Sequence, residues 1–228
     1  MAQAGGVVNS GVMRANDSER LLAGYVTGPR AATDATAAAL TRAAAARAVV
    51  LVEGISDQIA VETLASRQRR DLAAEGVVVL PVGGVHGVSR YLRLFGPEGT
   101  GARLAGLCDE AEEHIVRRGL AAAGLGAAGS RAELERLGFS VCVADLEDEL
   151  IRAAGTALAA EVLAAHGDLG AFRTIQRQPA WRGQAAAAQL RRFLGAGSRR
   201  KLRYARLLTE AIDPDRIPRP LEAVLAAV

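Results

Sequence analysis

The stretch VVLVEGISDQIAVETLA, residues 49–65, decides the fold. Its apolar, β-branched start is typical of a strand buried on both faces of a sheet. The strand runs directly into Glu53 and Gly54, and a second carboxylate, Asp57, follows at the start of a helical pattern for which Ser56 or Asp57 is the expected N-cap. A buried strand that ends on a carboxylate and turns at once into a helix predicts an α/β fold with a polar site at the strand end.

The same pattern recurs along the chain. A helix-favouring segment, 34–47, precedes the first strand, and three further apolar segments are expected to form strands, namely 76–81, 103–108 and 138–144. Helical stretches separate them, so the sequence predicts a four-stranded, mainly parallel sheet flanked by helices.

Three parts follow from this pattern. Residues 1–33 are rich in glycine, alanine and small polar residues and are expected to be a flexible lead-in. Residues 34–150 form the α/β domain. Residues 151–228 contain no convincing strand and are expected to form an appended region of four or five helices.

Acidic residues follow three of the predicted strands. Glu53 follows the first strand, Asp109 the third, and the fourth leads into an acidic group, Asp145, Glu147 and Asp148. Parallel strands end at one edge of their sheet, so these carboxylates are expected to converge there. Clustered carboxylates repel each other unless a cation intervenes, and their oxygens suit Mg²⁺ or Mn²⁺. For Asp57, helix capping alone is an equally good explanation.

These residues resemble a known family. The segment VVLVEGISD, the later LAGLCDEAE and the βαβ order are similar to the topoisomerase–primase (Toprim) domain, in the version found in the OLD (overcoming lysogenisation defect) family of ATP-dependent endonucleases. The resemblance covers residues 47 to about 150, and GSRRKLRYARLL also looks like the OLD-type C-terminal segment. It implies a parallel sheet, a divalent metal at the acids, and nicking or cleavage of DNA.

Carried over by position, the resemblance implies that Glu53 is a metal ligand or general base and that Asp57 and Asp109 are metal ligands. Glu147 resembles a further acidic position of the OLD type. One position departs from the pattern, because the second aspartate of the family's Asp-x-Asp motif falls on Ala111. Neighbouring Glu112 could take the place of this aspartate as a ligand, as could Glu110 or Glu113. The expected metal ligands are Glu53, Asp57, Asp109, Glu112 and Glu147.

The basic residues are concentrated in the second part of the chain. Residues 1–150 carry a formal charge of −4, and residues 151–228 carry +7. Lys201 is the single lysine among 28 basic residues. The resemblance implies that Lys201 is a catalytic cation that stabilises the transition state. Its neighbours are expected to contact DNA phosphates together with it, namely Arg199, Arg200 and Arg203. The alternative is that these cations are simply solvated on a helix.

Other signals limit the function. The chain has no apolar run long enough to cross a membrane and no secretion-type start, and its two cysteines lack zinc spacing, so a cytoplasmic protein with reduced thiols is expected. The glycine-rich segment 81–87 lacks the Lys-Ser/Thr of a phosphate-binding loop, so an ATPase would have to be a separate partner. Its His86 is expected to face solvent.

Two other classes of function stay open. In the first, Ala111 marks lost chemistry, and the chain is a binding module for nucleic acid or protein. In the second, the same metal site hydrolyses phosphodiesters in RNA or in a smaller substrate.

Overall fold

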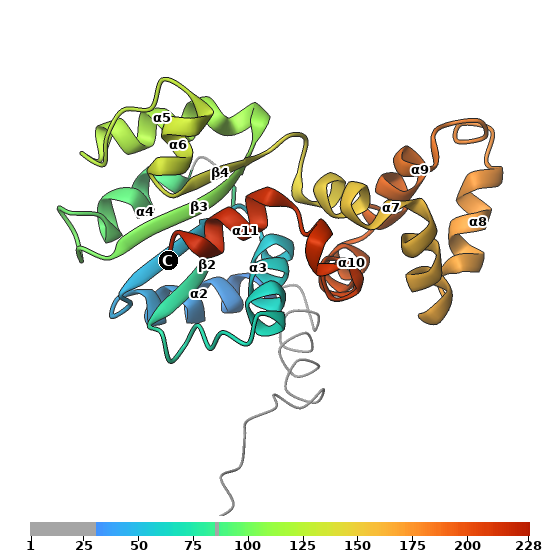
Figure 1. Ribbon diagram of the computed structural model, residues 1–228, viewed down its shortest axis with the longest axis horizontal. Helices are drawn as coiled ribbons and strands as arrows, with labels where there is room; N and C mark the ends of the chain where they lie inside the picture. The colour runs from blue at the N-terminus through green and yellow to red at the C-terminus, as the bar shows by residue number, and fades with distance from the viewer. Residues whose placement is uncertain (1–30, 85–86) are drawn as a thin grey trace, which may run out of the picture.

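The computed structural model describes residues 31–84 and 87–228, and its centre is a four-stranded parallel sheet (Figure 1). The strands are β1 (Ala48–Val52), β2 (Val77–Pro81), β3 (Arg103–Asp109) and β4 (Phe139–Cys142). They lie in the order β2-β1-β3-β4, and every neighbouring pair is parallel. The expected fold class, a parallel sheet with helices around it and a helical C-terminal part, is confirmed.

Both faces of the sheet are covered. The side chains of β1 alternate between two cores, with Val50 and Val52 on one face and Val49 and Leu51 on the other. This alternation explains why the strand is apolar throughout. The first face packs against α3 (Ile55–Arg67) and α11 (Arg219–Ala226), and the second packs against α2 (Ala31–Ala43), α4 (Val88–Phe95), α5 (Glu113–Ala122) and α6 (Arg131–Arg136).

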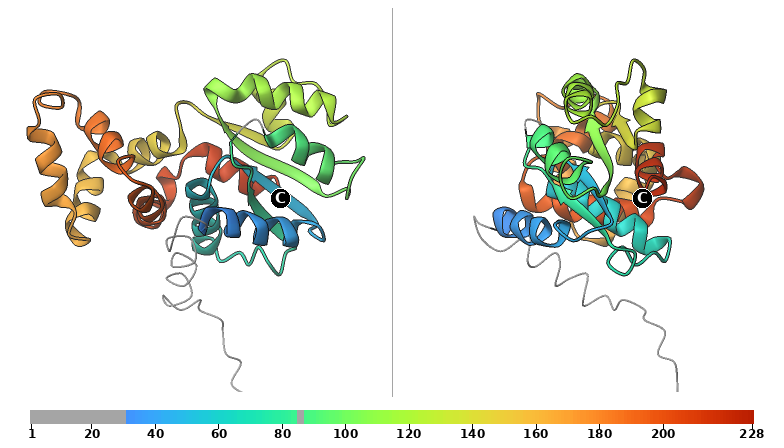
Figure 2. Two further views of the ribbon diagram at one scale, coloured as in Figure 1. Left: turned by 180° about the vertical axis from the view of Figure 1, so that it is seen from behind. Right: turned by 90° about the vertical axis from the view of Figure 1, so that its left-hand side faces the viewer.

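The C-terminal part is helical and leaves the sheet before returning to it. It contains α7 (Leu146–Ala165), α8 (Leu169–Arg177), α9 (Ala186–Leu194), α10 (Ser198–Ala211) and finally α11. Figures 1 and 2 show α8 and α9 at the end of the molecule farthest from α4 and α5. Helix α10 comes back against α3, where the Arg67 guanidinium donates to the Thr209 carbonyl at 2.6 Å.

The two parts share one core. The boundary expected between residues 150 and 151 falls inside α7, and buried residues of α7 to α11 join the same apolar cluster as β1 and α3. Gly155 kinks α7 at a positive φ of 72°, where the helix leaves the sheet region. No described helix is both long and apolar enough to span a bilayer.

The predicted elements differ from the observed ones in detail. The first described helix begins at Ala31 and ends at Ala43, earlier than the expected 34–47, and most of the predicted lead-in lies outside the described residues. Helix α6 is not among the predicted elements, although Ser130 and Glu133 form a capping box at its start. The described residues also form 3₁₀ turns at Glu110–Glu112 and Pro214–Arg216.

Candidate metal and catalytic site

The carboxyl ends of β1 and β3 lie side by side at one edge of the sheet. Leu51 pairs with Gly106, so Glu53 follows the end of β1 close to where Asp109 closes β3. The loop after β2 supports this position, because the amides of Gly83 and Gly84 donate to the Glu53 carbonyl at 3.1 and 3.3 Å. These two hydrogen bonds hold the backbone of Glu53 in place at the carboxyl edge of the sheet.

Asp57 lies in the first turn of α3 and reaches back towards β1. Its Oδ2 accepts a hydrogen bond from the Gly54 amide at 2.8 Å. The N-cap is Gly54 itself, so the expected assignment of Ser56 or Asp57 as N-cap is wrong: Asp57 satisfies the exposed amide from inside the turn. Burial is the main cause that raises the pKa of Asp57 to about 7, and Glu147 and Glu53 add to it, whereas the Gly54 hydrogen bond and Lys201 lower it.

Asp109 is also surrounded by carboxylates. Burial raises its pKa to about 7, with further contributions from Glu53, Asp57, Asp145 and Glu112. These carboxylates come from three segments, at the ends of β1, β3 and β4, and those of the first and third segments lie close enough to Asp109 to raise its pKa. The repulsion between them is the physical signature of a site that attracts cations.

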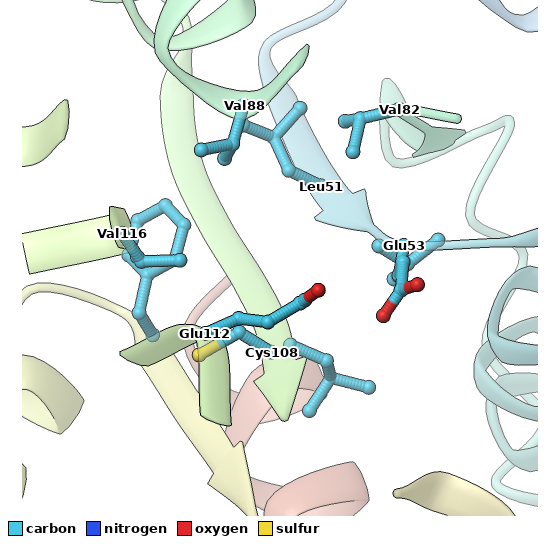
Figure 3. A pocket seen from close by; sticks show the side chains of 10 residues that line it. Leu51, Glu53, Val82, Val88, Cys108, Glu112 and Val116 are labelled. Carbon is cyan, nitrogen blue, oxygen red and sulfur yellow. The ribbon is translucent and has the colours of Figure 1, made fainter. Parts of the chain in front are cut away.

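Glu112 points into the site from the segment after β3. It lines a pocket with Glu53 whose walls are apolar and include Leu51, Val88 and Val116 (Figure 3). The carboxylates of Glu53 and Glu112 point towards the same space in that view.

The neighbouring glutamates have other partners. Glu110 and Glu113 both form ion pairs with Arg131. Of the three glutamates considered as substitutes for the aspartate missing at Ala111, Glu112 is therefore the one directed at Glu53.

Two groups from the helical part complete the cluster. Glu147, in the first turn of α7, is buried, and its Oε1 lies 3.0 Å from the Nζ of Lys201. Burial alone would lower the pKa of Lys201, but Glu147, with Asp57 and Asp145, raises it. The lysine is thus paired with the acidic cluster rather than simply solvated on its helix.

Arg191 is a residue of this region that the sequence analysis does not identify. It lies in the last turn of α9, and its guanidinium forms an ion pair with Oδ2 of Asp145, with the Nε atom at 3.1 Å. The other oxygen of Asp145 accepts from the Asp148 amide at 2.8 Å and caps α7. Arg191 and Asp145 are 46 residues apart in the sequence, so no local pattern predicts their ion pair.

The other expected DNA-binding residues have surroundings outside the acidic cluster or are exposed. Arg199 is exposed, whereas Arg200 stacks over the Phe193 ring at 4.1 Å and donates to the Phe193 carbonyl. Arg203 forms an ion pair with Asp168 at 3.1 Å. Their assignment as phosphate contacts stays a prediction.

Tyr204 and the two cysteines lie in the protein interior. Tyr204 is buried, and its hydroxyl donates to Asp168 at 2.8 Å. Cys108 and Cys142 are buried free thiols, and burial raises the pKa of Cys108 to about 12. His86 lies outside the described residues.

The donor set fits a hard divalent cation in its chemistry. All candidate ligands are carboxylate oxygens, which Mg²⁺ and Mn²⁺ prefer. At Gly54, an added Cβ would meet no atom closer than Asp57 Oδ2 at 3.7 Å, so the protein itself does not require glycine there and the small residue leaves room at the site. Among the described residues, however, no three acidic, histidine or cysteine side chains form a finished metal cage.

Comparison with known proteins agrees with this architecture. Residues 46–110 match the family model "Overcoming lysogenization defect protein-like, TOPRIM domain". No curated protein matches the chain.

Solved structures extend the similarity beyond the matched segment. The C-terminal region of the Xanthomonas campestris pv. campestris OLD protein is similar with a TM-score of 0.63 and 24% identity, over 80% of this chain and 92% of that one. The C-terminal region of the Burkholderia pseudomallei OLD protein gives a TM-score of 0.58 and 21% identity, over 80% and 96%. The chain therefore contains a Toprim domain of the OLD-like type, within a fold like that of the C-terminal regions of OLD proteins.

Proposed function

We propose that the chain is a divalent-metal-dependent endonuclease that acts on DNA phosphodiesters. The observation that carries the proposal is the electrostatic coupling of Glu53, Asp57 and Asp109 at one edge of the sheet, with Lys201 beside them. The OLD-like Toprim match supports a role within this class of nucleic-acid-processing domains.

The metal ligands would come from three segments. Glu53, Asp57 and Asp109 would hold Mg²⁺ or Mn²⁺, with Glu147 from α7 and with Glu112 in the role left open by Ala111. When bound, the ion would polarise a phosphoryl oxygen and lower the pKa of a bound water. The apolar walls beside Glu53 and Glu112 would limit water on one side, which strengthens the interaction between the carboxylates and a cation.

Glu53 and Lys201 would act directly on the reacting groups. Glu53, at the tip of β1, would accept a proton from the attacking water as general base. Lys201 has an ammonium group whose pKa is raised by the acids around it, so it stays charged at neutral pH. It would donate hydrogen bonds to the phosphate oxygens as negative charge grows on them.

A second candidate is a DNA-binding module without cleavage. Ala111 in place of the motif's second aspartate favours it, as does the lack of a finished metal cage among the described residues. The two candidates differ in whether the acids serve catalysis or only attract cations.

Nicking of supercoiled plasmid separates the two. The wild-type chain is expected to convert supercoiled DNA to the open circle with Mg²⁺ or Mn²⁺ and to stop when EDTA is added. Glu53→Gln should lower the rate at least about 100-fold, whereas Glu98→Gln, an exposed carboxylate away from the site, should not change it. Plasmid binding without nicking by the wild type would overturn the nuclease assignment. Parallel assays with RNA and a simple phosphodiester test the substrate class.

A further inference from the structure

The segment from Leu169 to Leu194 has an unusual charge composition. It comprises α8, the connection after it and α9, and we call it the helical arm. It contains five arginines and no aspartate or glutamate, and the acid-free stretch continues to residue 209. The five are Arg173, Arg177, Arg182, Arg191 and Arg192, and all are exposed.

The other surface helices of the chain are different. Several of their arginines form ion pairs with carboxylates three or four residues away, as in Arg117–Glu113, Arg152–Asp148 and Arg206–Glu210, although Arg93 of α4 and Arg118 of α5 form none with any described residue. Within the described part of the chain, Arg173, Arg177 and Arg192 have no ion pair and donate no side-chain hydrogen bond. An ordinary solvated helix carries charges of both signs, so the missing carboxylates on the arm indicate a surface for an anionic partner.

The arm is one packed unit. Phe172 of α8 meets Phe193 of α9 edge to face at 5.5 Å, and Gln176 donates to Gln189 at 2.8 Å. These contacts face inward and leave the arginines outside. The apolar side of each helix is therefore used for folding, and the charged side is free for a ligand.

The arm is joined to the acidic cluster at one point. The ion pair of Arg191 with Asp145 places the end of α9 at the carboxyl edge of the sheet. Arg192 is the next residue, and α8, with Arg173 and Arg177, packs on α9. A polyanion held by the arm would thus extend directly to the site at Glu53 and Asp109.

We propose that the helical arm binds the phosphate backbone of duplex DNA next to the scissile phosphate. The inference rests on the proposed function for the identity of the substrate. A duplex fits better than a single strand, because Phe172 and Phe193 are buried and the third aromatic ring of the arm, Trp181, is half-buried, so no ring is fully exposed for base stacking. The arginines are expected to contact phosphates, which carry no sequence information, so the arm contributes affinity without sequence preference.

The test compares two triple variants of the full chain. The arm variant is R173Q/R177Q/R192Q. The control, R93Q/R103Q/R118Q, removes three exposed arginines from α4, the first residue of β3 and α5, away from the arm and without ion pairs among the described residues. Fluorescence anisotropy with a labelled duplex, in Ca²⁺ and over a range of salt concentrations, gives the affinity and its salt dependence. Circular dichroism checks that both variants are folded.

The arm variant is expected to bind the duplex about 10- to 100-fold more weakly at 0.1 M salt. Its slope of log K against log salt should fall by about 2 to 3, one phosphate for each arginine. The control should change the affinity less than about twofold, and the single strand of the same sequence should lose less than the duplex. Equal losses in both variants, or no loss in the arm variant, would overturn the inference.

Plasmid nicking distinguishes failure of the arm assignment from failure of the proposed nuclease function. If the wild type binds DNA through the arm but does not nick it, the nuclease assignment fails and the arm assignment stands. If the wild type nicks and the arm variant binds as tightly as wild type, the arm assignment alone fails.

Discussion

The acidic edge of the sheet and the helical arm concentrate charges of opposite sign in different ways. At the edge, carboxylates from separate segments are brought together by the fold, and burial, with a smaller contribution from their mutual repulsion, raises the pKa of Asp57 and Asp109. On the arm, the arginines come from one continuous segment of the sequence that contains no aspartate or glutamate. Close, partly buried charges change each other's protonation, whereas exposed charges on a helix are screened by water and remain ionised. The first arrangement suits coordination and chemistry, and the second suits attraction of a long anion.

The largest expected effect comes from removing one carboxylate from the edge. Asp109→Asn keeps the size of the side chain but removes a charge from the centre of the cluster. Mn²⁺-dependent nicking should fall about 1000-fold or more, and Mn²⁺ binding, followed by calorimetry, should weaken at least about tenfold. DNA binding in Ca²⁺-free buffer should improve slightly, because a negative group near the phosphate is gone. Unchanged Mn²⁺ affinity would contradict the assignment of Asp109 as a ligand.

Substitutions of Lys201 test whether the cation paired with Glu147 acts in the chemical step. Lys201→Gln should lower the nicking rate about 100-fold while DNA affinity changes less than threefold. Lys201→Arg should recover only part of the rate, because the guanidinium is larger and planar. Arg206→Gln, which removes an arginine paired with Glu210 on the same helix, is the control. A loss confined to DNA affinity would instead make Lys201 one more phosphate contact.

The raised pKa values of the two aspartates predict how stability depends on pH. Between pH 4 and pH 7 the folded protein binds more protons than the unfolded chain, so the free energy of unfolding should fall as pH rises through this window. The difference is expected to be about 2 kcal/mol in metal-free protein after allowance for solvent screening. Urea denaturation at pH 5 and pH 8 measures it.

Mg²⁺ or Mn²⁺ should remove this pH dependence, because a bound cation favours the ionised carboxylates. The added ion should stabilise the protein at pH 8 and have little effect at pH 5. The double variant D57N/D109N should show neither effect. A stability that rises with pH in the metal-free wild type would contradict the pKa directions.

The smallest expected effect concerns Arg191, the contact between the two regions. Arg191→Gln should free the Asp145 carboxylate and make the cluster more negative, so Mn²⁺ affinity should increase about three- to fivefold. Duplex affinity should decrease by a similar factor. Arg152→Gln, which also removes an arginine paired with acids of α7, is the control and should change neither. Equal effects of both substitutions would show that only net charge matters.

Local patterns determined much of the α/β fold. The four apolar segments form strands because a strand in a sheet covered on both faces buries every side chain of a continuous apolar run. All five residues of β1 are buried in this way, alternately on the two faces. The convergence of acids could also be predicted, because parallel strands end at one edge whatever their order along the chain. Helix α6 is so short, with a single buried residue, Leu134, that its hydrophobic pattern is weak and its capping box is the main signal.

Tertiary structure alone decided which charges meet. The sequence offers Glu110, Glu112 and Glu113 equally, and only the folded chain turns two of them to Arg131 and directs Glu112 towards Glu53. The pairs Lys201–Glu147 and Arg191–Asp145 likewise join distant segments through the return of the C-terminal helices. Secondary structure follows from the burial of residues that are neighbours in the sequence, so it can be predicted from local sequence. Ion pairs between distant segments depend on packing across the whole molecule, and no local pattern predicts them.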